Sequence, residues 1–231
     1  MFDPLEGSPW SGAGMVAGFS QSAPNQTLMG FAAAERHNGT RALDIGCGAA
    51  RNALPLARLG WDVIGLDLSW PMLRAAVERG RQPVHGGRLE FALAPMEQLP
   101  IRDASVDLIV AHGIWNLASS SSQFRAAVRE AARVARPAAA LFVFTFSRTT
   151  LRPDDQPVAG EPFVFTQFSG EPQCFLTEAQ LVAELGAAGF ARDDAVPLRE
   201  HNVPRPGTVR AGGPPVIFEG TFRMQGKRAR L

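Results

Sequence analysis

Residues 42–69 read ALDIGCGAARNALPLARLGWDVIGLDLS, and this stretch decides the fold. A strand predicted from Arg41 to Ile45 runs into the turn 46–48, a helix follows to about Leu59, and a second strand ends at Asp67. Glycines at a strand-to-helix turn let a ligand approach the backbone closely. An acidic residue about 20 positions further on is placed to accept both hydroxyls of a ribose. The stretch therefore predicts a nucleoside site at one edge of a parallel sheet.

The residues around the turn distinguish between two kinds of ligand. A dinucleotide site needs a third glycine at position 51, where the helix packs near the pyrophosphate, and this chain has Arg51 there. Asp44 would repel a pyrophosphate, but it would attract the ammonium and sulfonium charges of S-adenosylmethionine. The motif therefore favours a cationic nucleoside.

The rest of the chain predicts an α/β domain. Apolar strands are expected at 88–93, 106–111 and 139–146, separated by helices, which is typical of a parallel sheet covered on both faces. A capping box at Thr177 and Gln180 begins a last helix. Two final strands, near 195–201 and 216–222, are expected to form a hairpin.

These elements predict a single domain over residues 1–231. Residues 1–40 would form a loose arm and a helix capped by Ser22, and 41–147 the nucleoside-binding core. Residues 148–176 include a long stretch without periodicity, which is typical of a lid or flap. Residues 177–231 would form the closing helix and hairpin.

Composition excludes several classes of protein. The chain has 231 residues, 23 Lys+Arg against 22 Asp+Glu and a formal net charge of +1, so we expect no nucleic-acid partner. No apolar stretch approaches the roughly 18 residues of a membrane helix, so we expect no membrane partner. Lys227, the only lysine, lies in a basic tail that we expect to be solvated. P-loop and pyridoxal enzymes, which need a lysine in the site, are therefore disfavoured.

The cysteines and histidines point to a protein without a metal site in a reducing compartment. The chain has 2 Cys and 4 His, and their spacing matches no common metal-ligand pattern. The N-terminus lacks a basic region followed by an apolar run, so we expect no signal peptide and a cytoplasmic protein.

Residues 42–69 resemble the first two motifs of the class I S-adenosylmethionine-dependent methyltransferases that act on small molecules. The similarity continues in MEQLPIRDASVDLIVAHGIWNL (96–117), TEAQLVAELGAAGF (177–190) and PPVIFEGTFR (214–223). It implies a Rossmann-like, doubly wound, seven-stranded sheet, mostly parallel with an antiparallel C-terminal strand. It also implies S-adenosylmethionine as the cofactor.

The resemblance further implies which residues contact the cofactor. The contacts would be made by Asp44, Gly46, Cys47, Gly48, Asp67, Leu68, Pro95, Met96, Glu97 and Ala111. Asp67 would hold the ribose, Leu68 would pack on the adenine, and Ala111 would flank the sulfonium. Many members have an aspartate where this chain has Pro95, so Glu97 or a backbone carbonyl would have to contact the adenine amino group.

Residues just beyond the fourth strand are candidates for the acceptor site. His112 lies at the edge where doubly wound sheets bind ligands. It could be a general base, orient the cofactor, or satisfy a backbone group. Trp115 and Asn116 follow, and Trp115 would be either a pocket wall facing the sulfonium or a core residue. Phe165 would line the acceptor pocket or anchor the flap.

The expected function is methyl transfer to a small-molecule acceptor by in-line displacement in a closed site, where positioning does most of the catalysis. Two alternatives stay open: a nicotinamide- or flavin-dependent oxidoreductase on a similar fold, and a non-catalytic nucleoside-binding module. The sequence carries no prediction of the acceptor or of the oligomeric state.

Overall fold

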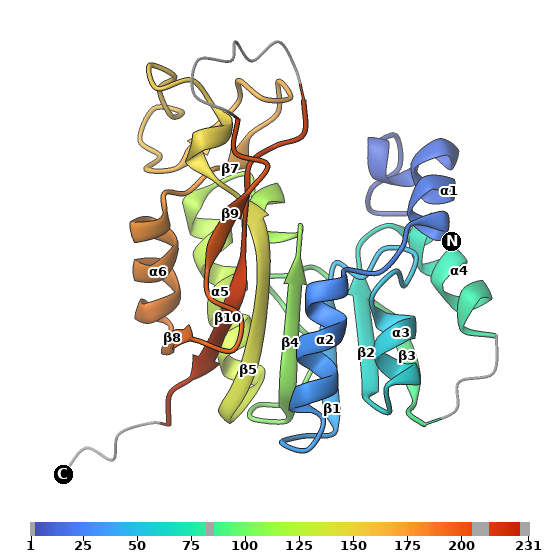
Figure 1. Ribbon diagram of the computed structural model, residues 1–231. Coiled ribbons are helices and arrows are strands. Elements are labelled where there is room, and N and C mark those ends of the chain that lie inside the picture. Colours follow the sequence, from blue (N-terminus) through green and yellow to red (C-terminus); the bar gives the residue numbers. More distant parts are fainter. Residues whose placement is uncertain (1–2, 82–85, 205–212, 227–231) are drawn as a thin grey trace.

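The strands predicted between residues 41 and 146 lie side by side in one twisted sheet (Figure 1). The computed structural model describes residues 3–81, 86–204 and 213–226. The basic tail that begins at Lys227 therefore lies outside the described residues. The strands of the main sheet are β1 (Arg41–Ile45), β2 (Asp62–Asp67), β3 (Leu89–Leu93), β4 (Val106–His112), β5 (Ala135–Phe146), β8 (Phe190–Asp193), β9 (Arg199–His201) and β10 (Ile217–Met224).

The strand order is β3-β2-β1-β4-β5-β10-β8, and β9 pairs with β10 beside this path. The pairs among β1 to β5 are parallel, whereas β10 runs antiparallel to β5, β8 and β9. The mostly parallel sheet with an antiparallel C-terminal strand is thus confirmed. The described sheet has eight strands where the sequence predicted seven.

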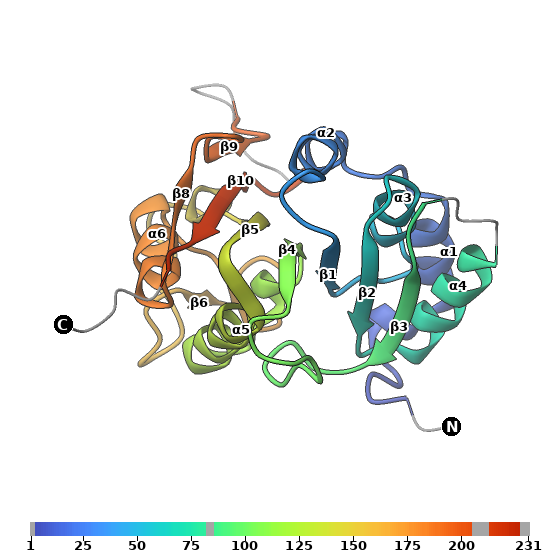
Figure 2. The same ribbon diagram turned by 90° about the horizontal axis from the view of Figure 1, so that it is seen from below.

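Helices cover both faces of this sheet (Figure 2). One face carries α2 (Gln26–Glu35), α3 (Ala53–Arg58) and α4 (Trp70–Gly80), and the other carries α5 (Ser121–Val134) and α6 (Glu178–Ala187). In β4, Leu108 and Val110 belong to the core beneath α2, while Ile109 and Ala111 belong to the core beneath α5. Because successive side chains on a strand point to opposite faces, two covered faces require this continuous apolar run.

Side chains cap the N-termini of α4 and α6, and the cap of α6 is the one that the sequence predicts. The Ser69 hydroxyl caps α4 by accepting the Met72 N–H at 3.3 Å, and Thr177 and Gln180 form a complete capping box on α6. Pro55 lies in the first turn of α3, where its missing N–H has no intrahelical partner to lose.

The N-terminal segment differs from the expected loose arm. It contains a 3-10 turn, η1 (Pro9–Ser11), and a helix, α1 (Ala13–Gln21). The Trp10 and Phe19 rings pack edge to face at 6.0 Å between centroids, and the segment lies against α4. The next helix is capped by Asn25 rather than Ser22, because the Asn25 Oδ1 atom accepts the Leu28 N–H at 2.8 Å.

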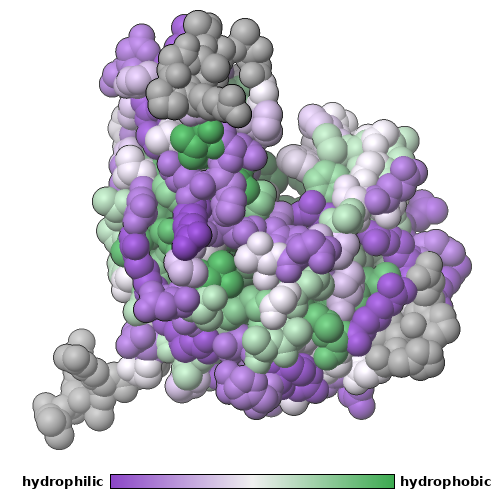
Figure 3. Space-filling model, in the orientation of Figure 1, coloured by the Kyte–Doolittle hydropathy of each residue, from purple (hydrophilic) through white to green (hydrophobic). Residues whose placement is uncertain are grey.

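Two lobes rise above the carboxyl ends of β1 and β4, and Figure 3 shows the surface hollowed between them. One lobe contains α1. The other contains the end of β5, a 3-10 turn η3 (Arg148–Thr150), and a two-stranded sheet of β6 (Val164–Phe165) and β7 (Gln173–Cys174). No helix in the described ranges is long and apolar enough to cross a membrane.

The core packing predicts a difference between two Leu→Ala substitutions in the same sheet. Leu108 is fully buried on β4, whereas Leu93 on the edge strand β3 is 41% exposed. Leu108→Ala should lower the free energy of unfolding by about 2–5 kcal/mol, because it leaves a cavity between the sheet and α2. The measurement is urea denaturation followed by circular dichroism, with Leu93→Ala as the matched control.

Leu93→Ala should cost less than about 1 kcal/mol, because its side chain already contacts water. Equal losses in the two variants would contradict the two-faced core.

Candidate active site

The turn between β1 and α3 is tied to the end of β2 by three hydrogen bonds. The N–H groups of Gly46 and Cys47 donate to the Leu66 carbonyl at 2.7 and 2.9 Å, and the Gly48 N–H donates to the Asp67 Oδ2 atom at 2.8 Å. Gly46 has a φ of 71°, and a Cβ added there would lie 2.7 Å from the Ile114 side chain. The turn therefore needs glycine for both conformation and space.

Cys47 is a packing residue of this turn. It is buried, and burial raises the pKa of its thiol well above the usual value. A thiol that stays protonated is a poor nucleophile.

Asp67 is held by the backbone at the end of β2. Its Oδ2 atom accepts the Gly48 N–H, and its Oδ1 atom accepts the Ser69 N–H at 2.8 Å. Burial raises the pKa of this carboxyl, and these backbone hydrogen bonds oppose the rise. Each carboxylate oxygen can accept a further hydrogen bond, so the group can bind two neighbouring hydroxyls.

Asp44 is a buried carboxyl on β1, with 1% of its surface exposed. Its Oδ2 atom has no hydrogen-bond partner among the described residues. Burial raises its pKa to about 7, the charge of Asp67 adds to this rise, and the charge of Arg51 opposes it. A buried carboxylate without an ion pair is costly in free energy, and a cationic ligand would offset that cost.

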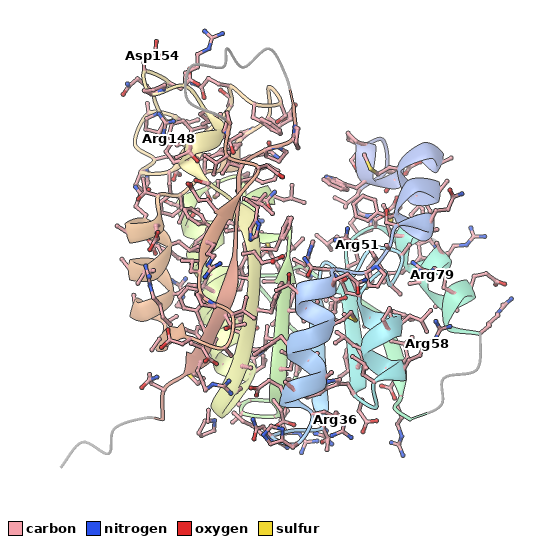
Figure 4. The ribbon with its side chains drawn as sticks, in the orientation of Figure 1. Arg36, Arg51, Arg58, Arg79, Arg148 and Asp154 are labelled. Atoms are coloured by element: carbon pink, nitrogen blue, oxygen red, sulfur yellow. The ribbon has the colours of Figure 1, made fainter. Side chains whose placement is uncertain are left out.

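His112 ends β4 and lies between donors. The Arg51 Nη2 atom is 2.9 Å from Nδ1, and the Asn25 Nδ2 atom is 3.2 Å from Nε2. The same Asn25 nitrogen donates to the Glu219 Oε2 atom at 2.7 Å. The His112 ring stacks on Phe144 with 4.0 Å between centroids. Figure 4 shows Arg51 near the top of α2, below α1.

The surroundings of His112 keep its ring neutral. Burial and then the charge of Arg51 lower its pKa to about 3. An imidazolium carries only N–H donors, and here both ring nitrogens face other donors. A neutral imidazole accepts at one ring nitrogen and carries a hydrogen on the other, so His112 can accept from Arg51 or from Asn25 but not from both, and it is a weak base.

The turn after β3 lies beside Asp67, because the Ala94 N–H donates to the Asp67 carbonyl at 3.1 Å. Leu68 and Pro95 are half-buried there. The Glu97 Oε1 atom accepts a hydrogen bond from Gln123 of α5 at 3.1 Å, so this carboxylate is already engaged. Met96 is 8% exposed and packs in the core beneath α5.

Ala111 is fully buried in that core, so only its backbone reaches the sheet edge. Three residues expected near the acceptor are also buried: Trp115 is 0% exposed, Asn116 2% and Phe165 3%. Trp115 packs against Phe124 of α5 at 6.1 Å between centroids, because the chain turns back under the sheet after β4. The structure does not bring these three side chains to the hollow.

Asn25, Phe144 and Glu219 were not singled out from the sequence. Phe144 and Glu219 pair across β5 and β10, and His112 pairs with Phe144 across β4 and β5. The side chains of His112, Phe144 and Glu219 therefore lie in one row across the sheet, on the face covered by α2. An acidic residue within the apolar run of β10 was the available signal, since buried charges need a partner.

The N-terminal segment contacts the Asp67 side of the site. The Ser69 hydroxyl donates to the Trp10 carbonyl at 3.1 Å, and the Trp70 N–H donates to the Asp3 Oδ1 atom at 3.1 Å. The segment that the sequence suggested to be loose thus packs beside the nucleoside site. In the described part of the chain, no group of three or more His, Cys, Asp or Glu side chains could hold a metal ion.

The known proteins that this chain resembles are methyltransferases. A family model described as a methyltransferase domain matches residues 43–143. A ubiquinone biosynthesis O-methyltransferase of Azorhizobium caulinodans is 28% identical over 155 residues, 66% of this chain and 59% of that protein. A demethylmenaquinone methyltransferase of Renibacterium salmoninarum is 32% identical over 116 residues, 50% of this chain and 45% of that protein. The chain thus spans less than two thirds of the length of these relatives.

The fold agrees with these matches. A crystal structure titled as SAM-dependent methyltransferases, from Methanosarcina mazei, superposes with a TM-score of 0.66 at 25% identity, covering 82% of this chain and 96% of that one. The sequence matches and the fold thus support a class I S-adenosylmethionine-dependent methyltransferase, with the family model covering residues 43–143. The comparisons do not support the oxidoreductase alternative.

The raised pKa of Asp44 predicts a pH-dependent affinity for S-adenosylhomocysteine, whose ammonium group would favour the ionised carboxylate. As the pH falls below about 7, the free protein protonates Asp44, so the dissociation constant should rise by up to about tenfold per pH unit. Isothermal calorimetry between pH 8 and 5.5 measures it.

Asp44→Asn keeps the shape and removes the charge, so its affinity should be weaker at pH 8 and nearly independent of pH. The charges of Asp67 and Arg51 also act on this group, and both residues are unchanged in the variant. A wild-type dissociation constant that stays flat over the range would contradict the role of Asp44.

Proposed function

We propose that the protein transfers a methyl group from S-adenosylmethionine to a small planar acceptor of quinone or phenol type. The observation that carries the proposal is the glycine turn joined to the Asp67 carboxylate, next to the unpartnered Asp44 oxygen. These groups offer hydrogen bonds for a ribose and a negative charge for an ammonium at one edge of the sheet.

In the proposed complex, Asp67 binds the ribose hydroxyls and Asp44 the ammonium group. Gly46, Cys47 and Gly48 allow close approach, and Ala111 contributes its backbone near the sulfonium. Leu68 and the turn 95–97 enclose the adenine. Because Gln123 holds the Glu97 carboxylate, a backbone group of that turn is the better candidate for the contact that an aspartate makes in many members.

The acceptor is proposed to lie in the hollow between the two lobes. His112 and the stacked Phe144 lie at the sheet edge there. On the taller lobe, Phe168 is 41% exposed and packs edge to face on Phe146 at 5.4 Å between centroids. Aromatic side chains favour planar ligands, and the two relatives named above are named for ubiquinone biosynthesis and for demethylmenaquinone.

When bound, S-adenosylmethionine supplies an electrophilic methyl group and leaves as a neutral thioether. The residues of the chain then need to orient the acceptor and exclude water rather than stabilise a leaving charge. The His112 ring lies within hydrogen-bond distance of the Arg51 guanidinium, 2.9 Å from Nη2 to Nδ1, and helps to fix its position. We therefore assign His112 to positioning and expect acceptors that reach the site already nucleophilic.

Both cysteines are free and buried, which is compatible with the cytoplasmic location that we propose.

The first test is ligand binding, because the turn and Asp67 must select the cofactor. The folded protein should bind S-adenosylhomocysteine and not NADH in calorimetry, and it should form S-adenosylhomocysteine from S-adenosylmethionine with a quinol or catechol acceptor. Asp67→Ala should weaken nucleoside binding about tenfold or more, since each charged hydrogen bond is worth about 1.5–3 kcal/mol.

Asp154→Ala, in an exposed loop of the taller lobe (Figure 4), is the matched control and should bind like the wild type. Binding of NADH without any response to S-adenosylhomocysteine would refute the proposal.

The second test concerns proton transfer. With a phenolate or other acceptor that is already ionised, His112→Gln should lower kcat by less than about tenfold, and the pH profile of kcat should keep its shape, because a ring with a pKa of about 3 is a weak base near neutral pH. His37→Gln, exposed and remote from the site, is the control. A loss of about 10²–10⁴-fold with a changed profile would instead identify His112 as a general base.

A further inference from the structure

Glu219 is a buried acidic residue on β10 to which the reaction described so far gives no role. It is 6% exposed. Its Oε2 atom accepts the Asn25 amide N–H at 2.7 Å. Its Oε1 atom accepts no hydrogen bond from the described residues, and the His201 Nε2 atom lies 3.8 Å away from it. One oxygen of the carboxylate is therefore held by the protein, and the other is open to a further donor.

No arginine neutralises this carboxylate in the part of the chain that the structure describes. Arg199 lies opposite Glu219 in the pairing of β9 with β10, but its side chain is exposed and forms no ion pair there. Acidic side chains are rarely this deeply buried without a charged partner. A ligand that donates a hydrogen bond to the free oxygen would offset part of the lost hydration.

The Glu219 carboxylate adjoins the proposed acceptor site. The Asn25 Nδ2 atom that donates to Glu219 is also 3.2 Å from the His112 Nε2 atom, so one nitrogen reaches both groups. Phe144 stacks on the His112 ring and pairs with Glu219 across β5 and β10. An acceptor that lies on His112 and Phe144 therefore has the free Glu219 oxygen at its side.

The group that reaches Glu219 is not the atom that receives the methyl group. Figure 1 shows β5 between β4 and β10, and neighbouring strands are about 4.8 Å apart. The methyl group is proposed to lie at the end of β4, near the Ala111 backbone. A carboxylate oxygen attracts an O–H or N–H donor and repels a carbonyl or ether oxygen. The acceptor thus needs a second substituent that carries a hydrogen.

We propose that the free oxygen of Glu219 accepts a hydrogen bond from a second hydroxyl group of the acceptor. The site then selects a dihydroxy aromatic ring, a catechol or a quinol, over a quinone or a mono-ether. This assignment rests on the proposed function and names the class of acceptor. Asn25 is a positioning residue, because its amide holds the carboxylate beside His112.

The same hydrogen bond limits the reaction to one methyl group. After the first transfer, the ring carries one ether oxygen and one hydroxyl. A second transfer would place the hydroxyl at the methyl group and the ether oxygen against Glu219, where it offers no hydrogen. A dihydroxy ring should therefore give the mono-ether as its only product.

The test offers acceptors in matched pairs that differ in the hydrogen on the second oxygen: catechol with 2-methoxyphenol, and hydroquinone with 4-methoxyphenol. The wild type should show a kcat/KM about tenfold to hundredfold higher for the dihydroxy member of a pair, because a hydrogen bond to a charged group is lost in the other. Mass spectrometry measures the formation of S-adenosylhomocysteine and of the mono-ether and di-ether products.

Glu219→Gln should reduce this preference to less than about threefold, chiefly by lowering kcat/KM for the dihydroxy ring. The amide keeps the shape and can still accept from Asn25, but it then presents N–H groups to the acceptor. Glu90→Gln, on the edge strand β3, removes the same charge from an exposed position and is the matched control. It should keep the wild-type preference, and thermal melts check that each variant is folded.

A preference that survives in Glu219→Gln would show that the size of the methoxy group, and not Glu219, decides the selection. An equal loss for both members of a pair would show a structural role only, and no preference in the wild type would also overturn the assignment. If the wild type binds S-adenosylhomocysteine in calorimetry but methylates none of the four rings, the role of Glu219 falls while the cofactor site stands. If it does not bind S-adenosylhomocysteine, the proposed function itself is wrong.

Discussion

The hydrogen bonds between the glycine turn and the end of β2 are the constraint on which the rest of the site depends. The turn donates to the Leu66 carbonyl and to the Asp67 carboxylate, so the carboxyl ends of β1 and β2 are fixed relative to each other. This attachment holds Asp67 at the sheet edge. It also sets the path of the chain to Arg51, which explains why binding groups from both strands face one place.

The buried ionisable groups of the site raise the free energy of the folded protein, and a bound ligand of complementary charge would lower it. Burial raises the pKa of Asp44 and lowers those of Arg51 and His112, because burial removes the hydration that would stabilise the charged form of each group. Such groups destabilise the empty protein and favour a ligand of complementary charge, and ligand binding in turn stabilises the folded state. Functional sites commonly contain such groups, which lower the stability of the fold and increase the affinity for the ligand.

Catalysis by such a site is mainly a matter of placement. A neutral His112 stacked on Phe144 offers a rigid surface, and the two lobes border the hollow above it. Aromatic contacts would orient the proposed acceptor there. Because the leaving group is neutral, the protein needs only to align the acceptor and exclude water.

The sequence alone determined the parallel sheet, its antiparallel last strand, the cap of α6, and the turn with its two aspartates, because hydrophobic period, capping and glycine conformation are local properties. It did not reveal α1, whose Gly- and Ser-rich sequence is ordered by packing against α4, nor the burial of Asn116, and it left open whether Trp115 and Phe165 line a pocket or pack in the core and the flap. Only the tertiary structure brought Asn25 to Glu219, 194 positions apart, and placed Arg51 on His112, because contacts between distant segments depend on how the strands are ordered in the sheet. No pattern within one segment records that order.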